Sequence, residues 1–353
     1  MQQVLAGATG NPSSVHRFGR AMRALIEDAR VRVAALAGAD PAGVVFTSGG
    51  TEANALAILG SARRRILASA VEHPSVLKAA ERIETIPVDA DGLVDLGVLQ
   101  AMLAAGSDPA LVSVMLANNE TGVLQPVAEV ARLAHRHGAI VHCDAVQAAG
   151  RLPLDVHALG VDLLTISAHK LGGPPGVGAL LIRGDAGPIA LLRGGGQERG
   201  LRAGTENVPG IAGFGAAAVA ARDCGESQRL TALRDWIEAG VRRLCPAARI
   251  LGGNAPRLPN TTCVTMPGVG GETQVIAFDL EGVAVSAGAA CSSGKIGRSH
   301  VLAAMGVDPA DAASAIRVSL GWTTTDGDVE RFLTVWQEIH ERAAAHRRMA
   351  SAA

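Results

Sequence analysis

The stretch from Ala139 to Gly178 constrains the fold of this chain more than any other. It contains two short apolar runs, Ala139–Cys143 and Leu163–Ser167, and turn signals follow each of them. Runs of this length, separated by a connection, are typical of buried strands in a parallel sheet. We therefore expect an α/β fold in which both strands end at the same edge of the sheet.

Polar side chains follow both of these runs. Asp144 and Gln147 come after the first, and Ser167, His169 and Lys170 lie at the end of the second. Ligands of open α/β sheets bind beyond the carboxyl ends of the strands, so an acid and a lysine would face one crevice. This pairing suits pyridoxal phosphate, whose aldehyde forms a Schiff base with a lysine and whose ring nitrogen needs an acidic partner.

Composition and charge exclude several classes of protein. The 353 residues carry a net charge of −1 without a long basic run, which excludes a nucleic-acid footprint. The apolar stretches are interrupted before the ~18 residues that a membrane span needs, and the N-terminus lacks the pattern of a signal peptide. The 5 cysteines form no C-x-x-C pair, which argues against a zinc site or a disulfide framework. We expect a cytoplasmic protein without a resident metal, and without nucleic-acid or membrane contacts.

A glycine-rich turn follows an early strand candidate, Val44–Thr47. Its sequence, Ser48-Gly49-Gly50-Thr51-Glu52, leads directly into the helix-forming run Ala53–Leu59. A strand, a glycine turn and a helix start can cradle a phosphate, because free backbone N–H groups and the positive helix end point at the anion. Turns of this kind are common, so this pattern alone leaves a phosphate site and an ordinary turn open.

Two further strand candidates end in polar clusters. Arg65–Ala70 leads to Glu72 and His73, and Leu111–Ala117 leads to Asn119. A lone histidine is more often a helix cap or a packed polar residue than a catalyst, and any one cluster can be structural. Their repetition after several strands, at the same topological position, is hard to explain by solvation alone. The sequence therefore predicts a site at this edge of the sheet.

The rest of the pattern predicts a large first domain and a smaller α+β domain. Before residue 225 we expect helices over Arg20–Leu36, Gln125–His137 and 210–225, a strand over Ala179–Arg183 and a long ordered loop over Arg193–Asn207. After it we expect an amphipathic helix over 230–244, strands and helices over Thr262–Met266, Thr273–Leu280, Val283–Ser286 and Ile316–Leu320, and a last helix from Asp326 to about Arg347.

Cys291 stands among small residues, in Ser-Ala-Gly-Ala-Ala-Cys-Ser-Ser-Gly. A free cysteine is usually a small buried hydrophobe, and that interpretation fits the other cysteines. It fits Cys291 poorly, because its neighbours offer little apolar surface and leave the thiol exposed on a loop.

Nine motifs of the chain occur in the order seen in one enzyme family. They are NPSSVHRFGR, TSGGTEAN, VEHPSV, NNETGVLQPV, HCDAVQAAG, SAHKLGGPPGVGAL, GGGQERGLRAGTENV, SAGAACSSG and IRVSLG. Over about residues 10 to 335 the chain thus resembles the cysteine desulfurases, pyridoxal-phosphate enzymes of the class V aminotransferase family. The length of the loop from Cys291 to Ser299 is that of the NifS/IscS-like group.

The resemblance implies the fold type I architecture of pyridoxal-phosphate transferases. Residues 10–225 would form the large cofactor-binding domain, with a mainly parallel sheet of the seven-stranded type. Residues 226–353 would form the small α+β domain that carries the cysteine loop. Family members usually begin with a strand and a Leu-Asp-x-x-Ala-Thr-Thr-Pro segment that is missing before Asn11 here. Two interpretations stay open: the start of the sequence is placed too late, or the protein lacks this part of the small domain and residues 1–9 are the remnant of a truncated N-terminal segment.

The resemblance also implies roles for the residues that would hold the cofactor. Lys170 matches the Schiff-base lysine, and Asp144 matches the partner of the pyridinium nitrogen. Gln147 matches the donor to the ring hydroxyl. His73 matches the histidine whose ring stacks on the cofactor, and that histidine is one of the catalytic residues of the family. The phosphate cradle matches Gly50, Thr51, Ser167 and His169, with Thr205 supplied by the partner subunit of a homodimer.

Substrate and sulfur would be handled by three other residues. Asn119 matches a residue near both cofactor and substrate, and Arg317 matches the residue at the substrate carboxylate, which a guanidinium binds bidentately. Cys291 matches the residue that takes sulfur as a persulfide, and it could transiently ligate an iron–sulfur cluster.

The activity that this resemblance implies is L-cysteine desulfuration, which yields L-alanine and a persulfide on Cys291. The sulfur would pass to an iron–sulfur scaffold or to a sulfur-carrier protein. Two alternatives stay open: another class V enzyme, such as an aminotransferase or a selenocysteine lyase, or a non-catalytic partner in sulfur transfer. The joint presence of Lys170, Asp144, His73 and Cys291 favours the desulfurase.

Overall fold

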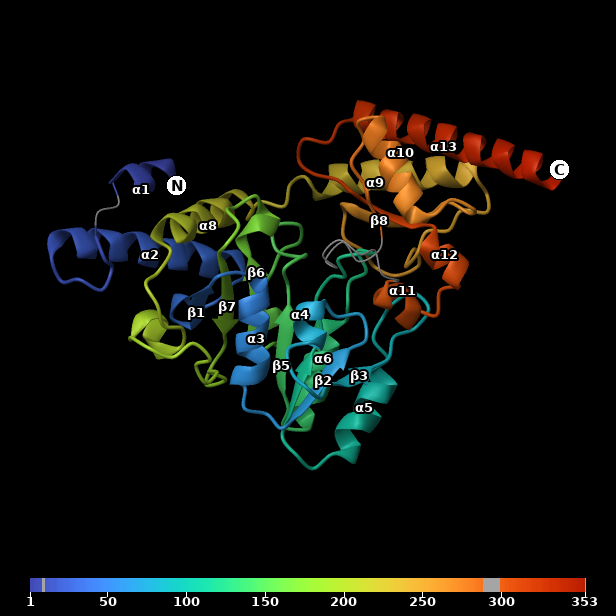
Figure 1. Ribbon diagram of the computed structural model, residues 1–353. Helices are drawn as coiled ribbons and strands as arrows, with labels where there is room; N and C mark the ends of the chain where they lie inside the picture. Colours follow the sequence, from blue (N-terminus) through green and yellow to red (C-terminus); the bar gives the residue numbers. More distant parts are fainter. Residues whose placement is uncertain (8–9, 288–298, 353) are drawn as a thin grey trace. The chain divides into compact units, whose positions relative to one another are not determined.

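The computed structural model describes residues 1–7, 10–287 and 299–352 (Figure 1). The chain divides into two compact units. The first consists of Met1–Pro87, Val94–Ala117 and Gln125–Cys224, and the second of Val88–Leu93, Asn118–Leu124 and Gly225–Ala353. Two short segments from the first half of the chain thus belong to the second unit. The boundary expected between residues 225 and 226 stays a prediction about folding domains.

A seven-stranded sheet forms the centre of the first unit, with the strand order β1-β7-β6-β5-β4-β2-β3. The strands are β1 (Val44–Thr47), β2 (Arg65–Ser69), β3 (Glu84–Ile86), β4 (Ala110–Ser113), β5 (Ile140–Asp144), β6 (Leu163–Ser167) and β7 (Gly178–Ile182). The pairs from β3 through β2, β4 and β5 to β6 are parallel. Only β7 is antiparallel to its neighbours β6 and β1, because the connection from β6 to β7 is too short for a crossover. The predicted mainly parallel α/β sheet is confirmed.

This topology places the carboxyl ends of six strands, β1 to β6, at one edge of the sheet. Since β1 and β6 are both antiparallel to β7, β1 runs in the same direction as β6 and the other parallel strands. The residues that follow β1, β2, β4, β5 and β6 therefore emerge at the same edge. Strand β4 is shorter than expected: after Ser113 the chain leaves the regular ladder, although it keeps bonds from Val114 N to His142 O and from Leu116 N to Asp144 O.

Helices cover the sheet of the first unit. They are α1 (Gln2–Gly7), α2 (Arg17–Leu36), α3 (Gly50–Gly60), α4 (Pro74–Leu77), α5 (Leu96–Ala105), α6 (Val127–Arg136), α7 (Val156–Leu159) and α8 (Val208–Ala220). Helix α3 packs on the sheet against β1, β5, β6 and β7 (Figure 1). Helix α2 begins earlier than predicted because the His16 ring caps it by accepting the Gly19 N–H. It packs closely on α8, where a Cβ at Gly215 would lie 2.8 Å from the Ala29 Cα.

The second unit contains an antiparallel sheet of three described strands, in the order β8 (Thr261–Thr265), β10 (Ala315–Ser319) and β9 (Ser286–Ala287). Its helices are α9 (Ser227–Leu244), α10 (Gly271–Leu280), α11 (His300–Ala304), α12 (Pro309–Ala313) and α13 (Asp326–Ala352). Its apolar core contains the fully buried Trp336 and a stacked pair, Phe278 and Phe332, with ring centroids 5.1 Å apart. Among the described residues, no helix combines the length and the apolar character that crossing a membrane requires.

Candidate active site

The glycine turn after β1 opens into the N-terminus of α3. Gly49 precedes the helix without a side-chain cap, and the Ser48 N–H donates to Glu52 Oε2 at 2.8 Å. The first N–H groups of a helix have no partner within it, so this end is suited to an anion. A side chain at Gly50 would be crowded, because a Cβ there would lie 3.0 Å from the Val146 Cγ2. Thr51 is exposed beside it.

The end of β6 meets this turn. A Cβ at Gly50 would lie 3.5 Å from the Ser167 Cβ, so the two candidate phosphate-binding segments are neighbours. Ser167 Oγ forms a 2.9 Å hydrogen bond with His169 Nδ1. Partial burial, and secondarily the charge of Lys170, lower the pKa of His169. His169 therefore serves near neutral pH as a neutral hydrogen-bonding group beside the hydroxyl of Ser167.

Lys170 follows in a single 3-10 turn, Ala168–Leu171, which ends at Gly172 with a left-handed φ of 79°. The left-handed residue explains why glycine follows this turn. Lys170 is half-buried, and its charge acts on both His169 and the buried Asp144. Lys170 and Asp144, which the sequence placed at two strand ends, thus lie close enough for the charge of the lysine to act on the carboxyl group.

Asp144 ends β5 with 6% of its surface exposed. Its Oδ2 accepts a 2.8 Å hydrogen bond from Asn54 Nδ2, and its Oδ1 accepts the Val146 N–H at 2.9 Å. Burial raises the pKa of Asp144, whereas these two hydrogen bonds and the charges of His73 and Lys170 oppose the rise. Each carboxylate oxygen accepts one hydrogen bond, and the two bonds together fix the orientation of the group.

His73 belongs to the same hydrogen-bonded chain. Its Nδ1 accepts the Ser75 N–H at 3.1 Å and lies 2.7 Å from Ser75 Oγ, which in turn accepts a 2.9 Å bond from Asn54 Nδ2. Because Nδ1 accepts the backbone N–H, the proton of the neutral ring is assigned to Nε2. Asn54 therefore links His73, through Ser75, to Asp144.

Sequence reasoning missed Asn54, although it lies in the motif TSGGTEAN. The available signal was its position one helical turn after Gly50, on a helix that packs over β5. Glu72, which the sequence placed in a polar cluster without assigning it a role, is fully buried, and its Oε1 accepts the Met115 N–H at 2.6 Å. Burial, with a smaller contribution from the charge of Asp144, raises its pKa well above the usual range.

Gln147 and Thr205 also lie in the first unit. Gln147 is half-buried in the turn after Asp144, whereas Thr205 is exposed in the loop between β7 and α8. This loop borders a cavity of about 140 Å³, whose lining includes Ser48, Thr205 and Glu206. Glu206 is buried, and neither of its carboxylate oxygens has a hydrogen-bond partner among the described residues.

Two predicted site residues lie together in the second unit. Arg317 on β10 donates from Nη1 to the Asn119 carbonyl at 2.8 Å and from Nη2 to Ser286 Oγ at 3.2 Å. Its buried Nε has no hydrogen-bond partner in the described part of the chain. Two N–H groups of the guanidinium are thus used on Asn119 and Ser286, which fixes the orientation of the side chain. Cys291 falls in residues 288–298, outside the described residues.

The residues of the first unit fit pyridoxal phosphate. Its phosphate needs several donors, and the open end of α3 with Ser167 supplies them in a cradle that a side chain at Gly50 would fill. Its ring nitrogen needs an oriented acid and its aldehyde needs an amine, which Asp144 and Lys170 provide. Within the described ranges, no group of three or more His, Cys, Asp or Glu residues could hold a metal ion.

Comparisons with known proteins agree with this class of fold and site. The model of the class V aminotransferases matches residues 1–332, so the chain belongs to this family, whose enzymes in general depend on pyridoxal phosphate. The chain is similar to the cysteine desulfurase of Cereibacter sphaeroides, with 45% identity over 95% of this chain and 90% of that protein. It is also similar to the cysteine desulfurase IscS of Dictyoglomus turgidum, with 42% identity over 97% of this chain and 90% of that protein.

Solved structures confirm the fold. The NifS-like protein of Rickettsia africae has a TM-score of 0.90 and 38% identity, over 96% of this chain and 94% of that chain. A second structure, described as a NifS-like protein, has a TM-score of 0.86 and 35% identity, over 96% of this chain and 95% of that one. The resemblance that the nine motifs indicated is therefore confirmed.

Proposed function

We propose that this protein is an L-cysteine desulfurase that uses pyridoxal phosphate to remove sulfur from L-cysteine, with L-alanine as the second product. The observation that carries the proposal is the oriented, buried Asp144 beside Lys170 and an open phosphate cradle. This arrangement of residues occurs in a chain that is 45% identical, over 95% of its length, to a protein named cysteine desulfurase.

The first-unit residues hold the cofactor and control its orientation. Gly50, Thr51, Ser167 and His169 bind the phosphate, and Gln147 donates to the ring hydroxyl. Asp144, fixed by Asn54 and Val146, keeps the ring nitrogen protonated. When bound, pyridoxal phosphate supplies an aldehyde for amines and an electron sink for bond cleavage at the substrate Cα.

Two side chains of the first unit are assigned to the cofactor ring and to proton transfer. Lys170 Nζ would hold the aldehyde of the cofactor and would accept the proton from the substrate Cα. His73 would lie against the cofactor ring. Its Nδ1 is held by Ser75, which is consistent with one fixed ring orientation rather than with a mobile proton carrier.

The substrate carboxylate is assigned to Arg317 and Asn119. Arg317 is oriented by the Asn119 carbonyl and by Ser286 Oγ. A carboxylate is the natural ligand of such a pre-oriented guanidinium. We assign to Cys291 the attack of its thiolate on the substrate sulfur, which it keeps as a persulfide until an iron–sulfur scaffold or a sulfur carrier takes it.

We further propose a homodimer in which Thr205 reaches the phosphate bound by the other copy. The exposure of Thr205 supports this assembly, because its side chain is accessible to a second copy of the chain. We place the reaction in the reducing cytoplasm, since all four described cysteines are free thiols.

The test of the function is product release from L-cysteine by purified protein, with and without added pyridoxal phosphate. With a thiol reductant present to release the persulfide sulfur, we expect sulfide and L-alanine in equal amounts, dependent on the cofactor and lost in Lys170→Ala. Formation of a keto acid instead of alanine would replace the proposal with an aminotransferase. Absence of any cysteine turnover by cofactor-loaded protein would point to a non-catalytic role in sulfur transfer.

A further inference from the structure

The loop that carries Thr205 contains a turn of unusual backbone geometry. Glu198 has φ 45° and ψ 41°, and Arg199 has φ 57° and ψ 32°. Gly200 follows with φ 77°. Three consecutive left-handed residues are sterically disfavoured for L-amino acids, and only the third is a glycine. Such a turn persists only where its surroundings hold it.

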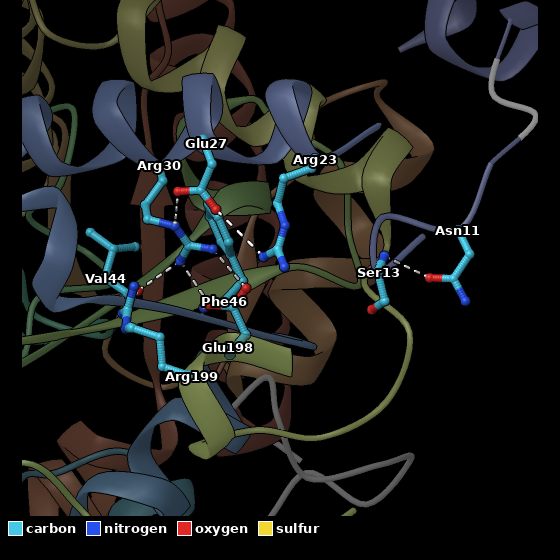
Figure 2. A network of polar contacts seen from close by, with 9 residues as sticks. All are labelled: Asn11, Ser13, Arg23, Glu27, Arg30, Val44, Phe46, Glu198 and Arg199. Carbon is cyan, nitrogen blue, oxygen red and sulfur yellow. Dashed lines mark hydrogen bonds and ion pairs between the residues drawn. The ribbon is translucent and has the colours of Figure 1, made fainter. Parts of the chain in front are cut away.

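A buried ion pair holds this turn. Arg30 from α2 donates from Nη1 to Glu198 Oε2 at 2.8 Å and from Nη2 to Oε1 at 2.9 Å (Figure 2). The two side chains are 4% and 2% exposed, and the Arg30 guanidinium lies 4.9 Å from the ring centroid of Phe46. The contact is bidentate and shielded from water, so it fixes the orientation of Glu198 more tightly than a surface pair would.

The same side chains occupy the free edge of β1. In the described sheet β1 pairs only with β7, which leaves backbone groups of Val44 and Phe46 on its outer side. The Phe46 N–H donates to Glu198 Oε2 at 2.8 Å. The Val44 carbonyl accepts from Arg30 Nη1 at 2.8 Å and from Arg199 Nη2 at 2.6 Å (Figure 2). The turn is thereby attached to the strand that ends at the phosphate cradle.

A second ion pair attaches the loop to the cradle itself. Arg202, three residues before Thr205, donates from Nε to Glu52 Oε1 at 2.9 Å and from Nη2 to Glu52 Oε2 at 3.3 Å. Glu52 lies in the first turn of α3 and also accepts the Ser48 N–H. Two fixed points, at Glu198 and at Arg202, therefore determine the path along which the chain reaches Thr205.

We propose that Arg30 and Glu198 are positioning residues for cofactor binding: their ion pair holds the left-handed turn and so directs the loop that presents Thr205 to the phosphate. This inference rests on the proposed function, in which Thr205 serves the second copy of the chain. The competing explanation is a pair that stabilises the fold and has no connection with the cofactor.

The chain offers a matched control for this explanation. Arg257 donates from Nη1 to Glu238 Oε1 at 2.7 Å and from Nη2 to Oε2 at 3.0 Å, and both side chains are 6% exposed. This pair is also buried and bidentate, but it lies in the second unit, and neither of its residues has a left-handed backbone. Glu238→Gln should therefore destabilise the protein much as Glu198→Gln does, without affecting the loop.

The experiment compares Glu198→Gln, Glu238→Gln and Thr205→Ala in the full-length protein. In cofactor-free protein, Glu198→Gln should speed amide hydrogen exchange across residues 194–207 about tenfold, and Glu238→Gln should leave it unchanged. The dissociation constant of pyridoxal phosphate should rise about tenfold in Glu198→Gln and in Thr205→Ala, as expected for one lost hydrogen bond to a charged group, and stay near the wild-type value in Glu238→Gln.

The outcomes separate this inference from the proposed function. Unchanged loop exchange in Glu198→Gln would overturn the positioning role, and so would a loosened loop with unchanged cofactor affinity. Equal loss of affinity in Glu198→Gln and Glu238→Gln would favour general stabilisation and would also overturn it. If the wild type fails to bind the cofactor, or if Thr205→Ala binds it normally, the assignment of the site itself fails, whatever the exchange result.

Discussion

Asn54 Nδ2 lies 2.8 Å from Asp144 Oδ2, although the two residues are 90 positions apart in the chain. The same nitrogen also donates to Ser75 Oγ, the partner of His73. One side-chain amide thus orients the acid that we assign to the cofactor nitrogen and, through a hydroxyl, the ring that we assign to the cofactor face. Asn54 is accordingly a positioning residue for both.

Replacing Asn54 should weaken cofactor binding through Asp144. In Asn54→Ala a buried carboxylate oxygen loses its donor, which costs about 1–3 kcal/mol and removes one force that opposes the raised pKa of Asp144. We expect weaker binding of pyridoxal phosphate, and a cofactor absorbance that becomes pH-dependent in a range where the wild type is constant. Titration of absorbance against pH measures this. The control Ser75→Ala keeps the bond to Asp144, so the same change in Ser75→Ala would refute the role of Asn54.

His142 should make the stability of the protein depend on pH. It is fully buried in β5 between Ser113 Oγ at 2.8 Å and Thr165 Oγ1 at 3.0 Å, and burial lowers its pKa from 6.5 to about 3. Between pH 6.5 and pH 3, His142 is protonated in the unfolded chain but neutral in the folded protein. Its contribution to the free energy of unfolding is therefore fully present above pH 6.5 and is lost as the pH falls toward 3. At pH 5 the loss from this group is about 2 kcal/mol.

Urea unfolding at pH 7.5 and pH 5 tests this dependence. His142→Gln keeps hydrogen-bonding atoms between the same two hydroxyls but cannot take up a proton. We expect the wild type to lose about 2 kcal/mol more than the variant between the two pH values. A matched control is His157→Gln, at an exposed histidine. An equal pH dependence of wild type and His142→Gln would contradict the assignment.

Arg317 should determine the affinity for the substrate carboxylate. Arg317→Lys keeps the charge but loses the planar fork that the Asn119 carbonyl and Ser286 orient, so we expect the KM for L-cysteine to rise about tenfold or more with a smaller change in kcat. Binding of cysteamine, which has no carboxylate, should be the same in wild type and variant. A variant that weakens both ligands equally would assign Arg317 a structural role.

The buried cysteines should not substitute for Cys291. Burial raises the pKa of Cys263 to about 12 and that of Cys143 well above the usual range, so neither thiol ionises near neutral pH. Cys263→Ala should therefore keep most of the sulfide release, whereas Cys291→Ser should keep the cofactor and release almost none. Assays of sulfide and of bound cofactor on both variants decide this. Full activity of Cys291→Ser would contradict the persulfide role.

The sheet and most of the site were predictable from the sequence because their signals are local. The apolar runs before Asp144 and Lys170 each fit one buried strand, and a parallel sheet brings the ends of such strands to one edge. Glycine at 50 was predictable as part of a turn that leads into a helix, and in the structure it is the first residue of α3, where a Cβ would be crowded by the Val146 Cγ2.

The residues that orient the site were not predictable in the same way. Asn54 meets Asp144, and Arg30 meets Glu198, across 90 and 168 positions, and no periodic pattern encodes such pairs. The left-handed backbone of Glu198 and Arg199 has no signal either, because turn rules assign this conformation to glycine or asparagine. The sequence predicted a long ordered loop at this point but did not indicate what holds it.

The most direct test of the account is a single turnover of cofactor-loaded protein with L-cysteine, without a reductant. The peptide that contains Cys291 is then analysed by mass spectrometry, and L-alanine is quantified. The account predicts that this peptide gains one sulfur atom per active site, with an equal amount of L-alanine, and that Lys170→Ala shows neither. L-Alanine without added sulfur on Cys291, or a keto acid in place of L-alanine, would contradict it.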